Sequence, residues 1–275
     1  MLQRSGILVH RSGDKSYFAH LGASGEDQFL SDHLWQVSAI CKRLGGKIGM
    51  ARAGELIGLM HDIGKYSEAF QQYLCEAADN AEMEMEPRGF GKGRIDHSTA
   101  GAQLVWSKLA QTGTSSVGHG AELLALCIAS HHSGLIDCVK PDGVDDLTRR
   151  LNKPDADTHC KEAWEAAEPV IREQIDALLS DPKLALELDS AFARIRQMDG
   201  DSVIQPFKRG LLLRILFSCL IDADRTDTAD FEKPVAGRFR QHGEYAAWSD
   251  LNADRQISRR SSDVLHNRTL QHIEL

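Results

Sequence analysis

Several features that define other classes of protein are missing from this sequence. The apolar runs at 123–129 and 211–221 are too short to span a bilayer, and the first residues, MLQRSGILVHRSGDKSYF, hold no apolar segment of signal-peptide length. The six cysteines form no CxxC pair, which argues against a disulfide framework and against a cysteine zinc site. We therefore expect a cytoplasmic protein that has no contact with membranes.

Basic charge is scarce as well. The chain has 32 lysines and arginines against 40 aspartates and glutamates, so its formal net charge is -8. Binding of duplex DNA through a broad basic surface depends on the neutralisation of phosphates by Lys and Arg, and this balance argues against such a surface. Any action on nucleic acid is therefore expected to be local or to need a partner.

The patterns that are present are mainly helical. The 275 residues are 42% hydrophobic, enough for one substantial core, and apolar positions recur at helical spacing along most of the chain. Before the helices, the stretch ILVHRSGDKSYFA holds two short β-prone runs around a Ser-Gly-Asp turn. These patterns predict an all-α helical bundle with a small N-terminal β-hairpin.

A single domain is expected over 1–275, with its core at about 24–230. Turn-forming and charged residues predict flexible insertions at about 76–96 and 136–158, and residues from about 231 to 275 are expected to form a polar tail. A capping box of Ser24 and Asp27 is expected to open the first helix. The expected helices are 26–46, 50–62, one from about 67, 97–113, 120–134, 158–179, 183–198 and 207–227.

Histidines stand out among the polar residues. Any one of them is more often a buried, hydrogen-bonded side chain than a metal ligand. Together with carboxylates at helix ends, however, they can bind divalent first-row metals, because several inward-facing helices can each donate to a shared centre. The adjacent His61 and Asp62 would project in different directions, so that each serves one of two metals or Asp62 bridges both. Five of the twelve stand at the ends or on the apolar faces of expected helices: His33, His61, His97, His131 and His132. This pattern predicts a dinuclear metal site.

Four motifs carry a resemblance to a known family. HDIGK resembles the signature of the HD metal-dependent phosphohydrolases. The longer string HDIGKYSEAFQQYL, followed in order by DHSTAGA, ASHHSG and DADRTDT, is similar to the HD nuclease domain of the CRISPR-associated nuclease-helicase of type I systems. The resemblance spans about residues 33–228, and it implies that the helical bundle is an HD domain.

The resemblance also implies site residues. Asp224 is ranked ahead of Asp222 because it best fits the family's aspartate and continues an apolar helix face, whereas Asp222 lies about 200° round the helix from it. Asp62 and Lys65 are the implied catalytic residues, and Lys65 would contact a phosphate oxygen; the alternative for Lys65 is a solvated side chain beyond a helix end. The implied metal ligands are His33, His61, Asp62, His97, His131, His132 and Asp224.

The implied reaction is hydrolysis of phosphodiester bonds with two divalent metal ions, expected to be transition metals (Mn, Fe, Co or Ni), with Mg as a further candidate. The implied substrate is single-stranded DNA, delivered in CRISPR interference by a helicase and an RNA-guided surveillance complex. Endonuclease and exonuclease activity both stay open.

The chain has no GxxxxGKS or GxxxxGKT loop, so the helicase domains are expected to be absent. We therefore expect a separate nuclease subunit or an excised domain. Two other classes of function stay open: a small-molecule HD phosphohydrolase that acts on nucleotides, and a metal-free interaction module.

Overall fold

The computed structural model describes residues 8–9, 15–22, 26–82, 95–110, 115–138, 143–198 and 204–238. The chain divides into two compact units, Met1–Pro234 and Val235–Leu275. The site described below lies within the first unit. The single domain expected over 1–275 stays a prediction, and most of the expected polar tail lies outside the described residues.

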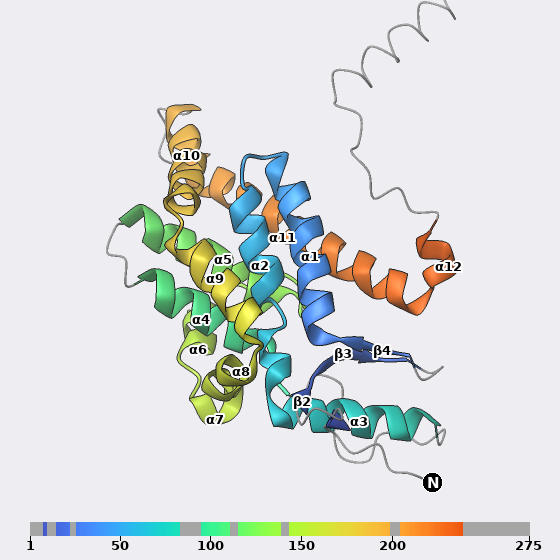
Figure 1. Cartoon of the computed structure of the whole chain (residues 1–275). Coiled ribbons are helices and arrows are strands. Elements are labelled where there is room, and N and C mark those ends of the chain that lie inside the picture. The colour runs from blue at the N-terminus through green and yellow to red at the C-terminus, as the bar shows by residue number, and fades with distance from the viewer. Residues whose placement is uncertain are drawn as a thin grey trace, which may run out of the picture. The chain divides into compact units, whose positions relative to one another are not determined.

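Helices dominate the first unit and pack on one another (Figure 1). Their apolar stripes form a shared core, to which Leu34, Ile57 and Ile128 contribute fully buried side chains from three different helices. The expected all-α bundle is confirmed. The described helices are α1 (Leu30–Gly46), α2 (Ala51–Met60), the 3₁₀ helix η1 (Ile63–Tyr66), α3 (Glu68–Glu82), α4 (Ser98–Ala110), α5 (Ser115–Ser130), α6 (Asp146–Leu151), α7 (Asp155–Thr158), α8 (Cys160–Ala166), α9 (Pro169–Ser180), α10 (Pro182–Met198), α11 (Ile204–Glu232) and α12 (Pro234–Gly237).

Two short β-hairpins precede the helices. In the first, β1 (Leu8–Val9) pairs antiparallel with β2 (Lys15–Ser16), which confirms the expected hairpin; the turn between them lies outside the described residues. In the second, β3 (Phe18–Leu21) pairs antiparallel with β4 (Asp27–Phe29). This second hairpin was not expected from the sequence, and its last strand leads directly into α1.

The expected start of the first helix is wrong. α1 begins at Leu30, later than expected, because the preceding residues form β4. Phe29 is its N-cap, and no side chain caps the helix. Asp27 does not cap it either: its Oδ1 accepts a hydrogen bond from the Gly22 amide at 3.3 Å. Ser24, the other half of the expected capping box, lies outside the described residues.

The long helix expected at 158–179 is in fact two helices, α8 and α9. The chain is extended at Ala167, where ψ is 142°, and Pro169 occupies the first turn of α9. Proline lacks an amide proton and disfavours helical geometry in the residue before it, so a continuous helix cannot pass this point.

The segments expected as flexible insertions contain helical residues. α3 continues to Glu82 and so takes in the start of segment 76–96, of which the middle lies outside the described residues. α6 and α7 both lie within segment 136–158. α6 has a side-chain cap, because Asp145 accepts hydrogen bonds from the amide and the hydroxyl of Thr148 at 3.0 and 2.7 Å.

A close contact between α1 and α2 sets the position of the site. A Cβ atom on Gly58 of α2 would lie 2.5 Å from the Cα of Ser38 on α1, so only glycine lets the two backbones meet here. The Ser38 hydroxyl also donates to the Glu55 carbonyl at 3.1 Å. This contact holds His33 of α1 close to His61, which follows α2.

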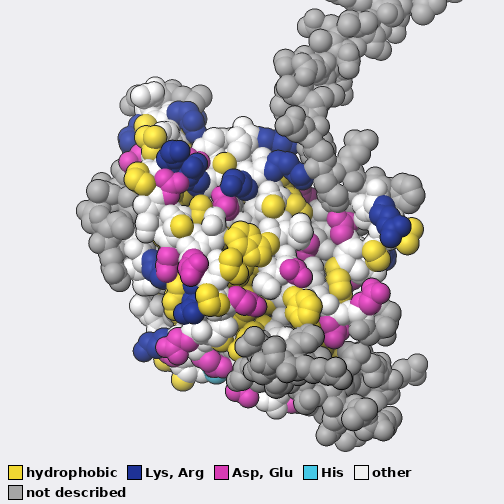
Figure 2. Space-filling view, in the orientation of Figure 1, with side chains coloured by type: hydrophobic (Ala, Val, Ile, Leu, Met, Phe, Trp, Pro, Cys, Tyr) yellow, Lys and Arg dark blue, Asp and Glu magenta, His cyan; other side chains and the backbone are white. Residues whose placement is uncertain are grey.

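No described helix is both long and apolar enough to cross a membrane. All six cysteines lie in the described part of the chain, and none of them forms a disulfide. On the face drawn in Figure 2, basic and acidic side chains of the described residues are interspersed, and no continuous basic stripe crosses that face. This distribution agrees with the net charge of -8.

Candidate metal centre

The structure brings together all seven residues that were expected to be metal ligands. They come from α1, from the turn after α2, from the residue directly before α4, from the turn after α5 and from α11. Within each of two groups, one candidate ligand atom per residue lies within 4.8 Å of all the others. The first group is His33, His61, Asp62 and Asp224, and the second is Asp62, His97, His131 and His132.

The first group is almost completely buried. His33 Nε2 lies 3.3 Å from His61 Nε2 and 3.4 Å from Asp62 Oδ2. Asp224 Oδ1 lies 3.5 Å from the same His33 nitrogen, and the Asp224 side chain is 16% exposed. Asp222 is exposed instead. The placement of the two aspartates on α11 thus agrees with the expected ranking, and a ligand role for Asp224 becomes part of the proposal below.

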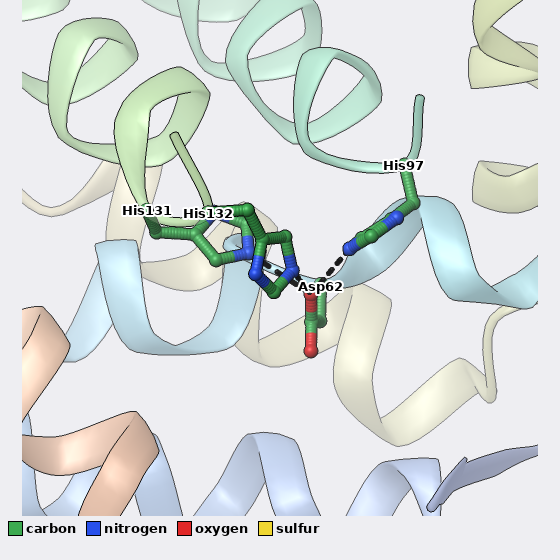
Figure 3. A group of neighbouring side chains, drawn as sticks. All are labelled: Asp62, His97, His131 and His132. Atoms are coloured by element: carbon green, nitrogen blue, oxygen red, sulfur yellow. Dashed lines mark hydrogen bonds and ion pairs between the residues drawn. The ribbon is translucent and has the colours of Figure 1, made fainter. Parts of the chain in front are cut away.

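The second group consists of three imidazoles that point at one carboxylate (Figure 3). Asp62 Oδ1 lies 3.2 Å from His131 Nε2 and 3.5 Å from His97 Nε2. His132 Nε2 lies 3.7 Å from the same oxygen, and the His132 side chain is 48% exposed. The second group is therefore open to solvent on the side of His132.

Asp62 divides its two oxygens between the groups. Its Oδ2 lies 3.3 Å from His61 Nε2, whereas its Oδ1 lies 3.2 Å from His131 Nε2. A carboxylate that presents one oxygen to each of two ligand groups has the geometry needed to bridge two cations. The adjacency of His61 and Asp62 in the sequence thus has a spatial counterpart at the junction of the groups.

The glycine of the HDIGK motif has a packing role beside Asp62. A Cβ atom on Gly64 would lie 2.2 Å from the carbonyl oxygen of His97 and 2.7 Å from its Cα. Only glycine lets η1 pass this close to the start of α4. This contact brings His97 to Asp62 although the two residues are on separate helical segments.

The state of His97 fits a bound cation. Its Nε2 is buried and makes no hydrogen bond, while its Nδ1 donates to the Ile95 carbonyl at 3.2 Å. Burial lowers the pKa of His97 to about 3, so the ring is neutral and Nε2 presents a lone pair. A buried lone pair without a donor is costly, and a metal ion would satisfy it.

Backbone carbonyls orient two more rings. His61 Nδ1 donates to the Gly58 carbonyl at 2.8 Å, and His131 Nδ1 donates to the Ile128 carbonyl at 2.7 Å. Because a carbonyl only accepts hydrogen bonds, Nδ1 carries a proton in both rings and Nε2 faces the centre. Both side chains are therefore held with the nitrogen that can bind a metal directed at Asp62.

Without a metal, positive charge on the protein balances these carboxylates. Burial lowers the pKa of His61, but the carboxylates of Asp62 and Asp224 outweigh this effect and raise the pKa to about 10. Burial lowers the pKa of His131, which lies farther from Asp224 in the second group. The pKa values of these two histidines are thus shifted in opposite directions, because the carboxylates outweigh burial at His61 and do not outweigh it at His131.

Lys65 supplies further positive charge. It is only 5% exposed, so it is not a solvated surface lysine. Its Nζ lies 2.8 Å from Asp62 Oδ2 and donates to the Ala19 carbonyl at 3.4 Å. In this structure Lys65 thus contacts the shared carboxylate, and its expected contact with a phosphate oxygen stays a prediction.

Three residues beside the centre were missed in the sequence. Asp227 Oδ2 lies 2.7 Å from His33 Nδ1 and accepts a hydrogen bond from Gln28 Nε2 at 2.7 Å. His20, on β3, stacks edge-on against His33 with ring centroids 5.3 Å apart. Asp227 had a detectable signal, because it follows Asp224 by one helical turn in DADRTDT. Gln28 and His20 belong to the unexpected second hairpin and had none.

Comparison with known proteins identifies the family. Residues 28–197 match the family model described as "Cas3, HD domain", which is more than half of the chain. No curated protein matches the chain. The matched region includes every proposed ligand except Asp224. The chain belongs to the family of Cas3 HD domains, the metal-dependent nuclease domains of type I CRISPR systems.

Proposed function

We propose that this chain hydrolyses phosphodiester bonds in single-stranded DNA with two divalent metal ions, and that it does so in CRISPR interference. One observation carries the proposal: Asp62 offers Oδ2 to His61 and Oδ1 to His131, each within a complete group of candidate ligands. A shared carboxylate between two sets of ligands is the arrangement that a dinuclear hydrolytic centre requires.

The proposed ligands are the seven residues of the two groups, with Asp62 common to both. When bound, two divalent ions would lower the pKa of a water molecule, hold a non-bridging phosphate oxygen and stabilise the leaving oxygen. Histidine-rich groups suit Mn, Fe, Co or Ni better than Ca, which prefers oxygen ligands, and Mg stays a candidate.

The residues of the chain have distinct roles in this proposal. His61 and His131 are buried and held by backbone carbonyls, so they provide a rigid frame. His132 is half-exposed and opens the second group to a strand of nucleic acid. Lys65 keeps Asp62 ionised through direct contact, and its ammonium group is the one that we propose contacts a phosphate oxygen of the substrate.

The preference for single strands follows from charge. The net charge is -8, and the face in Figure 2 mixes acidic and basic side chains. On that face a duplex would therefore find few neighbouring cations to bind its backbone, whereas an opened strand could be delivered to the centre by a partner. We propose a helicase and an RNA-guided surveillance complex as the partners that open and deliver the DNA.

The test uses the purified chain with Mn²⁺ and circular single-stranded DNA, and relaxed duplex DNA of the same sequence for comparison. We expect cleavage of the single-stranded circle, little cleavage of the duplex, and none after chelation of the metal. Asp62→Ala should abolish cleavage, whereas Asp222→Ala, which changes an exposed aspartate outside both groups, should not.

Two outcomes would contradict the proposal. Efficient cutting of fully paired duplex at physiological salt would contradict the preference for single strands that we infer from the net charge. Release of nucleoside or inorganic phosphate from free nucleotides, with no action on DNA, would instead identify a small-molecule phosphohydrolase that uses the same metal centre.

A further inference from the structure

We propose that Asp227 is a positioning residue for the first metal group: it holds the His33 ring in the orientation and tautomer that leave Nε2 free to bind an ion. This inference rests on the proposed metal centre. It adds a residue on α11 that belongs to neither group of candidate ligands.

The two nitrogens of His33 face in different directions. Nε2 lies 3.3 Å from His61 Nε2 and 3.5 Å from Asp224 Oδ1, so it belongs to the first group. Nδ1 lies 2.7 Å from Asp227 Oδ2. Because the two nitrogens are on opposite sides of the ring, Asp227 cannot bind the same ion as Nε2 and acts on it only through His33.

Gln28 determines which partner donates in this contact. Its Nε2 lies 2.7 Å from the same Asp227 Oδ2 and can only donate a hydrogen bond. Turning the amide round would place its oxygen against the carboxylate, which is unfavourable. Asp227 Oδ2 is therefore an acceptor for both neighbours, and the proton of a neutral His33 lies on Nδ1. Nε2 then carries the lone pair that a metal requires.

His33 differs from the other oriented rings. His61, His97 and His131 each place Nδ1 against a backbone carbonyl, whereas His33 places it against a carboxylate. A charge-assisted hydrogen bond is stronger than a neutral one and makes the imidazole a more basic ligand. The first group also contains two carboxylates, Asp62 and Asp224, against one in the second. We therefore expect the first group to bind its ion more tightly than the second.

A purely structural role for Asp227 makes a different prediction. Its side chain is 10% exposed and joins β4 to α11 through Gln28, so it could serve only to hold the fold together. In that case its loss would lower the stability of the metal-free protein and would affect both metal groups alike. If Asp227 is a positioning residue, its loss would change the tautomer of His33 and would lower the metal affinity of the first group only.

Three variants separate these roles. Asp227→Ala removes both the charge and the acceptor, and Asp227→Asn removes the charge while the Gln28 amide keeps the Asn oxygen turned toward His33. Asp222→Asn is the matched control, because it removes the same charge from an exposed position on the same helix. Metal binding is measured by titration of the metal-free proteins with Mn²⁺ and by elemental analysis. The tautomer of His33 is read from imidazole nitrogen chemical shifts in metal-free protein at a pH where the ring is neutral.

We expect two bound ions in the parent protein and in Asp222→Asn. Asp227→Ala should lose about 10–100-fold in affinity at the tighter step only, and the neutral His33 ring should no longer be held with its proton on Nδ1. Asp227→Asn should keep the tautomer and lose less affinity than Asp227→Ala at that same step. If Asp227→Ala does not fold, the comparison of Asp227→Asn with Asp222→Asn still distinguishes a positioning role of Asp227 from a structural one.

The outcomes distinguish this inference from the proposed function. A parent protein that binds no metal would overturn the proposed function itself. A parent that binds two ions, together with Asp227 variants that bind both with unchanged affinity, would overturn only the role of Asp227. Equal losses at both binding steps would assign Asp227 a general structural role instead.

Discussion

The ammonium nitrogen of Lys65 lies 2.8 Å from Oδ2 of Asp62, and both side chains are buried. Oδ2 is the same oxygen that faces His33 and His61 in the first group. Lys65 thus provides positive charge at the position where the proposed centre would receive its first ion. Because Lys65 stabilises the charge of a proposed metal ligand, we expect its contribution to the stability of the protein to depend on whether metal is bound.

Lys65→Met should destabilise the metal-free protein by about 3–5 kcal/mol, the usual cost when one partner of a buried ion pair is removed. The loss should be smaller with saturating Mn²⁺, because the bound ions compensate the charge of Asp62. Urea unfolding with and without Mn²⁺ measures both values. Equal losses in the two conditions would show that Lys65 and the metal act on Asp62 independently.

Mn²⁺ should raise the melting temperature of the parent protein, because an ion that binds only the folded state stabilises it. At a metal concentration 100 times the dissociation constant, the gain is about 2.7 kcal/mol for one site. Ca²⁺ should give a smaller shift, since the ligands include five histidines. Thermal melting with a series of divalent ions checks the order, and an equal response to Ca²⁺ would count against the assigned ligands.

Gly58→Ala should destabilise the protein by about 1–3 kcal/mol and weaken metal binding at the first group. Its added Cβ would lie 2.5 Å from the Cα of Ser38, so α1 and α2 must separate and His33 moves away from His61. Gly118→Ala on α5 is the control, because its added Cβ would meet no other described part of the chain within 4 Å beyond its neighbours and the backbone of its own helix. Alanine is a better helix former than glycine, so the control should be neutral or slightly stabilising. Chemical unfolding and Mn²⁺ titration of both variants measure the difference.

His131→Ala and His132→Ala should separate stability from metal binding at the second group. His131 is buried and its Nδ1 donates to the Ile128 carbonyl, so its loss removes this hydrogen bond and the packing of a buried ring and should cost about 0.5–3 kcal/mol. His132 is 48% exposed, and its removal should change the stability of the metal-free protein little. Both variants should bind metal less well at the second group. Melting of metal-free protein, followed by elemental analysis, compares them; a large loss of stability in His132→Ala would contradict its assigned exposure.

The sequence by itself was sufficient to predict the helical class, the first hairpin, the family and the residues that meet at the centre. These features depend on local patterns: apolar residues at helical spacing, histidines and aspartates at helix ends, and short motifs such as HDIGK in a fixed order. Helical periodicity also predicted that Asp224 rather than Asp222 faces the core, and Asp222 is indeed the more exposed of the two, since burial follows the face of a helix; which of them binds a metal stays a prediction. The break before Pro169 had a local signal as well, although the expected helix ran through it.

Only the tertiary structure decided how these residues are paired. It divides the ligands into two groups, assigns one oxygen of Asp62 to each, and turns Lys65 onto Asp62. It also joins Asp227 to His33, which is 194 residues away in the sequence, and to Gln28 of the unexpected second hairpin. Sequence periodicity shows which face of an element is buried, but the partner of a buried polar atom depends on which distant backbones can approach. Here that approach is set by close contacts such as Gly58 against Ser38, which exist only once the helices have packed.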